Sequence, residues 1–332
     1  GHRNRPTDRR DSARVLVVTD EGIERAGLLD GLLDALARSS VEPQVFSEVE
    51  PNPRHSTVQE IARVFKEGAH RAVVAIGGGS VLDAAKGALV VAAHGGNIGD
   101  YEGWETFSAG ALPPLLAIPT TAGTGSEVGA WAVITDTASH RKLNIGGRGM
   151  APAVALLDPT LTYSLPKSLT VATGMDALAH AIEAYTTVRA QPISDALALE
   201  AIRLIAQHLP VAADKGEDEA ARSGMLLAAT MAGMAMDQTD IGPVHCLSES
   251  MGGLYDAPHG QLNAVLLPYI MAHNIAHAAG RYANLAQALG GEPEPLAAVS
   301  RIVRFVRRFE LPSLADLGAQ RTDFDLLSHR AA

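Results

Sequence analysis

The sequence has few cysteines, few charged residues and no long apolar run, and each shortage excludes a class of protein. One cysteine, Cys246, is present among 332 residues, so no intrachain disulfide and no cysteine-based zinc knuckle can form. This usage is typical of a reducing compartment, and we expect a cytoplasmic protein. Charged residues make up 19% of the chain and hydrophobic residues 47%. Because disordered chains have high charge and few apolar residues, this composition predicts a folded protein with a substantial core.

The sign of the charge limits the partners further. The 27 basic and 37 acidic residues give a formal net charge of −10. A long polyanion would be repelled by such a protein, so we expect no nucleic-acid partner. The apolar runs fall short of the roughly 20 residues that a membrane span requires. Residues 1–14 are polar and basic, unlike a secretory signal, and we expect no membrane association.

The pattern of apolar residues changes near residue 160. Before it, short β-branched runs alternate with segments of helical periodicity, which predicts βαβ units around a parallel sheet. The expected strands are 14–19, 44–46, 71–76 and 115–119, and the expected helices are 23–37, 58–67 and 80–92. After residue 160 no strand is evident, and helices are expected at 170–187, 193–209, 217–236, 243–254, 262–277, 281–289 and 295–309. We therefore predict an α/β nucleotide-binding domain over residues 1–160 and an all-helical domain over 161–332.

Glycine is the abundant residue, at 32 of 332, and one cluster of it follows a predicted strand. Residues 77–79 are all glycine, and they join the strand 71–76 to a helix. Glycine lets a backbone approach a phosphate closely, and a helix N-terminus attracts anions. Ser80 and Asp83 have the spacing of a capping box. The alternative is a plain tight turn with a capped helix, since the pattern is neither G-x-G-x-x-G nor the Walker lysine motif.

A second polar loop, TTAGTGSE over residues 120–127, follows the strand 115–119. In an open α/β sheet, ligands bind beyond the carboxyl ends of the strands. Two such loops in one domain favour a nucleotide site over two unrelated turns. Asp20, at the end of the first strand, could accept hydrogen bonds from a ribose or cap the helix that follows.

The second half of the chain carries a candidate set of metal ligands. Asp176 and His180 are four residues apart, which places both on one face of a helix. His245 and His259 follow in later segments, and His259, between a proline and a glycine, is expected in a loop. One carboxylate and three imidazoles suit Fe²⁺, Zn²⁺ or a similar divalent ion. A D-x-x-x-H pair alone is more often structural.

Four segments together resemble the iron-containing, or group III, alcohol dehydrogenase family. They are GGGSVLDAAK (77–86), PTTAGTGSEV (119–128), TGMDALAHAIEAYTT (173–187) and PHGQLNAVLLPYIMAHN (258–274). The resemblance implies a dehydroquinate-synthase-like fold with the active site in the cleft between the two domains. It implies a metal-dependent alcohol dehydrogenase or aldehyde reductase, in which hydride passes between NAD(H) and a small alcohol or aldehyde. NADP is the less favoured cofactor, and a homodimer is expected.

The resemblance also implies a role for each matching residue. The metal ligands would be Asp176, His180, His245 and His259, holding Fe²⁺, with Zn²⁺ or another divalent ion as alternatives. Asp20 would favour NAD over NADP, because a 2′-phosphate would meet a like charge. The residues expected at the cofactor are Asp20, Asn52, Gly78, Gly79, Ser80, Asp83, Thr120, Thr121, Thr124 and Lys142.

The sequence departs from the family pattern in two respects. Glu249 occupies a position where many relatives have a histidine near the substrate. It could relay a proton and disfavour anionic substrates, or it could be a helix-surface residue without a catalytic part. The family's N-terminal strand and hairpin, which normally help form the dimer, and its last helices are not matched in residues 1–332, which leaves the dimer open.

Three other functions compete with the main interpretation. A maleylacetate-reductase-like enzyme would use the same fold without metal, but it would not need the four ligands. A lyase like dehydroquinate synthase would need basic residues in the cleft, and the segment 176–260 contains few. A nucleotide-binding remnant without turnover is the non-enzymatic alternative.

Overall fold

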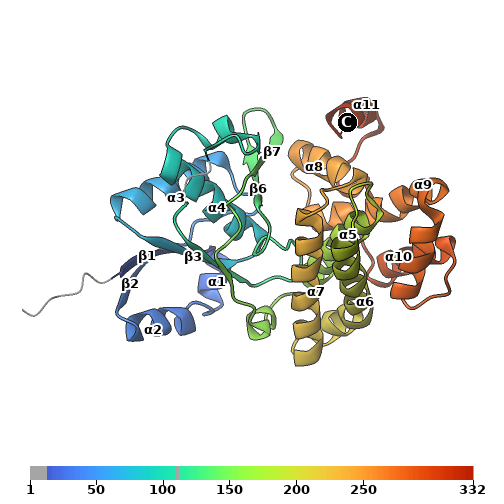
Figure 1. The fold of residues 1–332 in the computed structure, drawn as a ribbon, viewed down its shortest axis with the longest axis horizontal. Coiled ribbons are helices and arrows are strands. Elements are labelled where there is room, and N and C mark those ends of the chain that lie inside the picture. The colour runs from blue at the N-terminus through green and yellow to red at the C-terminus, as the bar shows by residue number, and fades with distance from the viewer. Residues whose placement is uncertain (1–12, 109–111, 332) are drawn as a thin grey trace, which may run out of the picture.

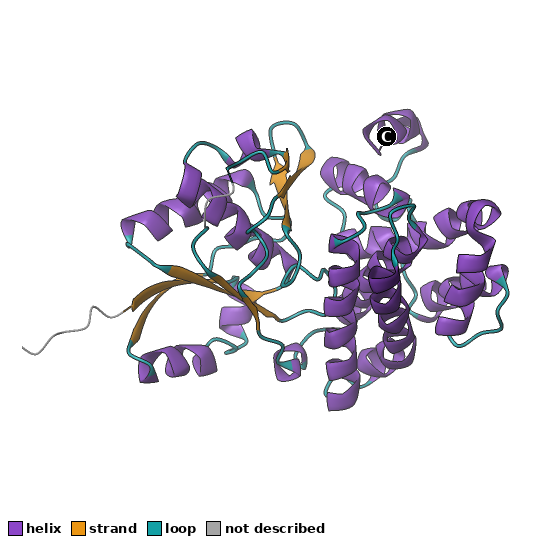
Figure 2. Cartoon of the chain, in the orientation of Figure 1, coloured by secondary structure: helices purple, strands orange, loops and turns teal. Residues whose placement is uncertain are grey.

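The computed structural model describes residues 13–108 and 112–331. Their elements form two parts that lie side by side, an α/β part from the first half of the chain and a helical part from the second (Figure 1). Within the described residues, strands occur only in the α/β part (Figure 2). The predicted fold class, an α/β domain followed by an all-helical domain, is confirmed. The boundary at residue 160 stays a prediction.

A five-stranded sheet with the order β2-β1-β3-β5-β8 is the centre of the α/β part. All its neighbouring strands pair in parallel. This order places the carboxyl ends of β3 and β5, and the loops that follow them, next to each other. The five strands are β1 (Ala13–Val18), β2 (Val41–Phe46), β3 (Ala72–Gly77), β5 (Leu115–Pro119) and β8 (Val154–Ala155).

Helices cover both faces of this sheet, which explains why its inner strands are uniformly apolar. Leu16 belongs to the apolar cluster with α3 (His55–Glu67) and α4 (Gly79–His94), which lie above the sheet in Figure 1. The next residue, Val17, belongs to the cluster with α2 (Asp30–Arg38) on the opposite face. Successive side chains of a strand point to opposite faces, so both of these residues are buried.

One predicted helix of the α/β part is wrong in its extent. The segment 23–37 forms two helices, α1 (Glu21–Arg25) and α2. Between them Gly27 adopts a φ of 68°, a left-handed conformation that ends a helix and that glycine adopts without steric cost.

A second sheet of three strands, which the sequence patterns did not predict, lies against α4. β6 (Trp131–Asp136) and β7 (Arg141–Gly146) form an antiparallel hairpin, and β4 (Gly103–Trp104) pairs with β7 in parallel. The hairpin contacts α4 through β6 and the helical part through β7. It therefore brings side chains of the α/β part to the boundary between the two parts.

The helical part is arranged around α5 (Lys167–Thr186), which is buried on all sides along most of its length. A helix without a polar face is typical of a protein core. Helices α6, α7 and α9 pack against it. The other helices of this part are α6 (Pro192–Asp214), α7 (Glu219–Asp237), α8 (Pro243–Tyr255), α9 (His259–Ala288), α10 (Pro295–Arg308) and α11 (Phe324–Ala331).

Helix α9 differs from the prediction of two separate helices at 262–277 and 281–289. It is continuous in its hydrogen bonding, but Ala278 leaves helical angles with φ −141° and ψ 33°, which kinks it. The predicted break is therefore close to a real bend.

Helix α6 has the length and apolar composition of a membrane span, with a mean hydropathy of 1.3 in its most apolar window. The sequence patterns had indicated no such segment. Ala198, Ile202 and Ile205 of this helix are buried in the apolar cluster of the helical part. Helix α6 packs against α5 and α7, and 39% of its most apolar stretch is buried.

Candidate active site

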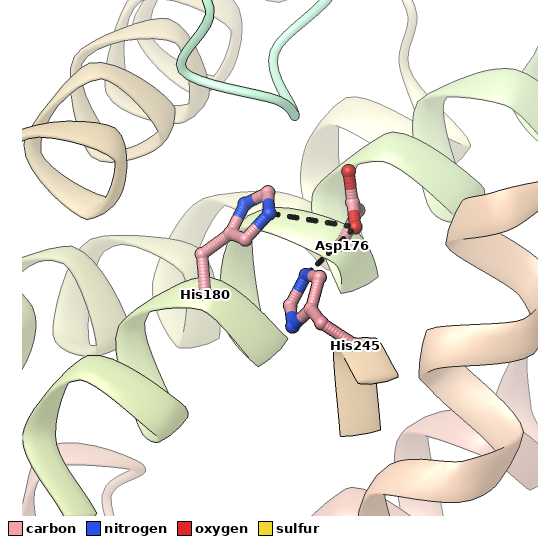
Figure 3. A group of neighbouring side chains, drawn as sticks. All are labelled: Asp176, His180 and His245. Carbon is pink, nitrogen blue, oxygen red and sulfur yellow. Dashed lines mark ion pairs between the residues drawn. The ribbon is translucent and has the colours of Figure 1, made fainter. Parts of the chain in front are cut away.

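The four predicted metal ligands come together in the helical part. Asp176 and His180 lie one turn apart on α5, His245 lies in the first turn of α8, and His259 is the first residue of α9. The Nε2 atoms of His180, His245 and His259 lie 3.9, 3.8 and 3.6 Å from Asp176 Oδ1. Figure 3 shows His180 and His245 directed at the carboxylate from two helices.

One expectation for this set is wrong: His259 does not lie in a loop. Pro258 is the N-cap residue of α9, and the helix begins at His259. A residue at a helix start keeps a fixed backbone direction, so its imidazole is held by regular structure.

The distance from Asp176 Oδ1 to each of the three Nε2 atoms suits two ligands of one cation. Ligand atoms about 2.1 Å from one tetrahedral ion lie about 3.4 Å from one another, near the 3.6–3.9 Å that separates each Nε2 from Asp176 Oδ1. Ligand atoms of Asp176, His180 and His245 all lie within 4.8 Å of one another. The side chain of His259 is 35% exposed, whereas the other three are nearly inaccessible. An accessible side beside one ligand is what a catalytic site needs for its substrate.

The protonation of these residues also suits a cation. Burial lowers the pKa of His180 and of His259 to about 4, so both are neutral at pH 7 and offer a lone pair. Burial alone would raise the pKa of Asp176, but the three imidazoles together hold it well below 3.8. Burial alone would lower the pKa of His245, but Asp176 and Glu183 outweigh it and raise this pKa to about 10. A cation at His245 therefore competes with a proton.

Asn263 belongs to the same centre, although the sequence patterns did not reveal it. Its Nδ2 donates to Asp176 Oδ1 at 2.6 Å and lies 3.0 Å from Nε2 of both His245 and His259. Asn263 Nδ2 therefore lies between three of the ligand atoms, while Asn263 Oδ1 is buried without a partner among the described residues. Asn263 follows His259 by four residues on α9, the spacing of Asp176 and His180 on α5, and this spacing was the available signal.

Glu183 is a second residue of this centre that the patterns did not reveal. It lies on α5, one turn beyond His180, and His245 Nδ1 donates to its Oε2 at 2.5 Å. The signal was its position three residues after a candidate ligand, but that spacing is common on any helix.

The two polar loops of the α/β part meet each other. A Cβ on Gly79 would lie 2.5 Å from the Thr124 side chain, and a Cβ on Gly78 would lie 3.4 Å from Thr121. The amide of Thr120 donates to Gly77 O at 3.0 Å. Helix α4 begins at Gly79, and no side chain caps its N-terminus, so the first amides of the helix can bind an anion.

The predicted capping box of Ser80 and Asp83 is wrong. Because α4 begins at Gly79 with Gly78 as its N-cap residue, Ser80 already lies in the first turn. Asp83 instead accepts hydrogen bonds from Ser126 Oγ at 2.5 Å and from the amide of Val133 at 3.0 Å. It ties α4 to the second loop and to β6, while its contact with a cofactor stays a prediction.

Asp20 caps a helix, one of the two roles considered for it. It is the N-cap residue of α1, and its Oδ1 accepts from the amides of Gly22 at 2.8 Å and Ile23 at 3.0 Å. Its backbone also forms a β-bridge with Glu48, which places a second acidic residue beside it. Its role in cofactor choice stays a prediction.

Asn52 and Lys142 form a chain of hydrogen bonds from the α/β part to α8. Lys142 Nζ donates to Asn52 Oδ1 at 2.8 Å and to Thr135 Oγ1 at 2.9 Å. Asn52 Nδ2 in turn donates to Asp256 Oδ1, at the end of α8, at 2.8 Å. Burial lowers the pKa of Lys142. The structure thus brings these two predicted cleft residues into direct contact.

Glu249 also connects the two parts. Its Oε2 accepts a hydrogen bond from Asn144 Nδ2 of β7 at 2.9 Å. Its charge acts to raise the pKa of His259, which places it near the metal ligands. It is therefore no isolated helix-surface residue, and a part in proton transfer stays a prediction.

The comparisons with known proteins agree with this geometry. Residues 5–159 match the family described as iron-containing alcohol dehydrogenase, and residues 170–332 match the description Fe-containing alcohol dehydrogenase family, C-terminal. Alcohol dehydrogenase 4 of Schizosaccharomyces pombe is 41% identical over 321 residues, which cover 96% of this chain and 76% of the relative.

Two further relatives extend the likeness. The NAD-dependent methanol dehydrogenase of Bacillus methanolicus is 39% identical over 326 residues, which cover 96% of this chain and 85% of the relative. The crystal structure of a 1,3-propanediol oxidoreductase superposes with a TM-score of 0.92 at 38% identity, over 96% of this chain and 85% of that one. The expected family, fold class and oxidoreductase class are confirmed: the chain belongs to the iron-containing alcohol dehydrogenase family.

Proposed function

We propose that this protein is a metal-dependent, NAD(H)-linked alcohol dehydrogenase or aldehyde reductase acting on a small alcohol or aldehyde. The observation that carries this proposal is the approach of three imidazole Nε2 atoms to Asp176 Oδ1, at 3.6–3.9 Å. Names of relatives such as NAD-dependent methanol dehydrogenase and 1,3-propanediol dehydrogenase support both the cofactor and the size of the substrate.

In this proposal Asp176, His180, His245 and His259 hold Fe²⁺ or a similar divalent ion. When bound, such an ion would supply a Lewis acid for the substrate oxygen, and NAD(H) would supply the hydride acceptor or donor. The protein's contribution is a buried carboxylate and two neutral imidazoles at fixed positions. His259, as the most exposed ligand, marks the side on which the substrate enters.

The cofactor is proposed to lie across the two loops at the ends of β3 and β5. The first amides of α4 would hold its pyrophosphate, and the contact between Gly79 and Thr124 leaves no room for a side chain at that glycine. Asp20 and the neighbouring Glu48 would face the ribose, and their negative charge would disfavour a 2′-phosphate.

Asn52, Lys142 and Glu249 are proposed to position the reactants between the two parts of the chain. Each of them already bonds across this boundary or to a residue that does. Glu249 is an acceptor at the boundary between the two parts and could take up a proton from a substrate hydroxyl. Its charge, together with the net charge of the chain, would disfavour an anionic substrate.

A cytoplasmic homodimer is part of the same proposal. The lone Cys246 supports a reducing compartment. Strand β2 is at the edge of the sheet, and its residues 42–45 are exposed, so it could pair with a second copy. The molar mass in solution, measured by light scattering, tests the dimer.

The experiment for the activity is NADH consumption with a panel of small aldehydes, after anaerobic loading with Fe²⁺ or Zn²⁺. We expect turnover that depends on the ion and disappears on chelation, while NADH binding remains. Undiminished turnover by metal-free protein would favour the maleylacetate-reductase type. NADH binding without turnover in any metal form would favour a nucleotide-binding remnant.

A further inference from the structure

Glu183 is a buried carboxylate that bonds to the backbone and to the side chain of one helix start. It is 5% exposed. Its oxygens accept from the amides of Val244 at 2.7 Å and Gly242 at 3.0 Å, and from His245 Nδ1 at 2.5 Å. One side chain of α5 therefore holds both the first turn of α8 and the imidazole that this turn carries.

The start of α8 depends on this carboxylate. Its N-cap residue, Gly242, has no side chain to cap the helix, and Pro243 follows with no amide hydrogen. Unpaired amides at a helix start are costly when buried, and a negative charge there is favourable. Glu183 supplies both the acceptor and the charge from a neighbouring helix, which fixes where α8 begins relative to α5.

The same contact determines which nitrogen of His245 faces the other ligands. A carboxylate at Nδ1 holds a proton on that nitrogen, which leaves Nε2 as the nitrogen available to a metal. Nε2 lies 3.8 Å from Asp176 Oδ1, on the side of the proposed ion. His180 Nδ1, by contrast, has no partner among the described residues, and His259 Nδ1 has only Ser248 Oγ, at 3.3 Å.

Charge provides a third argument. A buried charge is costly unless an opposite charge lies nearby, so carboxylates close to a buried divalent ion stabilise it. Asp176 provides one of them, and Glu183, behind His245, is the other buried carboxylate in contact with the four ligands. The pair Asp176 and Glu183 would leave the loaded centre neutral.

We propose that Glu183 is a positioning residue of the metal centre, which orients His245 and adds a second buried negative charge, beside that of Asp176, to stabilise a divalent ion. This inference rests on the proposed function, since it presumes a metal at the four ligands. Removal of such an outer partner typically weakens metal binding by about 10- to 100-fold.

The test measures the affinity of the full-length protein for Zn²⁺ and Fe²⁺ by competition with a chelator. Glu183→Gln keeps the shape of the side chain but removes the charge and one acceptor. We expect its metal dissociation constant to rise by about 10- to 100-fold, with NADH binding and the melting of the metal-free protein serving as measures of folding. Glu183→Asp retains the charge and should restore part of the affinity.

Glu127→Gln is the matched control. Glu127 is also a buried carboxylate, at 3% exposure, and accepts a hydrogen bond from Thr230 at 2.6 Å without touching a ligand. Its substitution should leave the metal affinity unchanged. An equal loss of affinity in both glutamine variants would overturn the inference, because it would show a general effect of replacing a buried carboxyl group.

Gly242→Ala provides an independent perturbation if Glu183→Gln does not fold. A Cβ there would lie 2.5 Å from Glu183 Oε1, so the carboxylate must shift while its charge remains. We expect weaker metal binding in this variant also. Wild-type affinity in every folded variant at Glu183 or Gly242 would overturn the inference alone, whereas absence of metal binding by the wild type would overturn the proposed function.

Discussion

Replacing Asp20 by asparagine separates two roles that one carboxylate performs. Asp20 Oδ1 accepts from two amides at the start of α1. Asparagine caps a helix about as well as aspartate, so this variant keeps the cap and removes the charge. Asp20→Ala removes both, and it should cost roughly 1 kcal/mol of stability. The difference between the variants isolates the charge.

The size of the effect follows from Coulomb's law. Asp20 is only partly buried, so the dielectric of water is appropriate. Two unit charges at 4 Å then repel by about 1 kcal/mol, and a phosphate monoester carries about 1.5 to 2 charges. The total repulsion is therefore roughly 1.5–2 kcal/mol. Removing the charge of Asp20 should raise the ratio of kcat/KM for NADPH to that for NADH by roughly 10- to 30-fold.

The assay is the ratio of kcat/KM for NADPH and NADH with one aldehyde, measured for the wild type, both Asp20 variants and Glu48→Gln. We expect both Asp20 variants to shift the ratio equally, and only Asp20→Ala to melt at a lower temperature. An unchanged ratio in Asp20→Asn would refute the reasoning. A shift in Glu48→Gln alone would assign the discrimination to the neighbouring residue.

Three further predictions concern the metal, the nucleotide loops and the pH dependence of stability. His259→Ala should lose bound metal and activity but keep NADH binding, and loss of NADH binding as well would indicate a failed fold. In Gly79→Ala the added Cβ would lie 2.5 Å from the side chain of Thr124. This variant should raise the dissociation constant of NADH roughly tenfold, equivalent to about 1.4 kcal/mol. The control Gly31→Ala, where the added Cβ would meet open space, should leave that constant unchanged. Burial raises the pKa of Glu127 above 4.5. The folded state therefore keeps the proton on Glu127 to higher pH than the unfolded state does. As a result, the free energy of unfolding falls as pH rises above about 4.5. Glu127→Gln should remove that fall, and equal slopes of urea midpoint against pH in both proteins would contradict this.

The parts of the fold that the sequence predicted are those whose burial is decided locally. Strands β1, β3 and β5 are largely apolar because helices cover both faces of the sheet, and α5 is recognisable by its long alanine-rich stretch. The hairpin of β6 and β7 was missed for the opposite reason. β7 reads RKLNIG, with only Leu143, Ile145 and Gly146 buried. Its place depends on pairing with β6 and β4 and on contact with α8.

The site residues that the sequence predicted are likewise those whose positions are decided locally. Asp176 and His180 could be predicted because one helix fixes their spacing. His245 and His259 were candidates from their residue type, and the family resemblance then implied that all four bind one metal. Glu183 and Asn263 were not found, because their roles arise from contacts between helices. The predicted capping box of Ser80 and Asp83 was wrong because the N-cap residue of α4 is Gly78, two residues before Ser80.

Metal stoichiometry and ligand distances in the wild-type protein test the central claim most directly. The full-length chain would be loaded anaerobically with one equivalent of Fe²⁺, and X-ray absorption would give the number and distance of its ligands. The account predicts one tightly bound ion per chain with nitrogen and oxygen ligands at about 2.0–2.2 Å, and loss of that ion in His259→Ala. A folded protein that binds NADH but retains no divalent ion would contradict it.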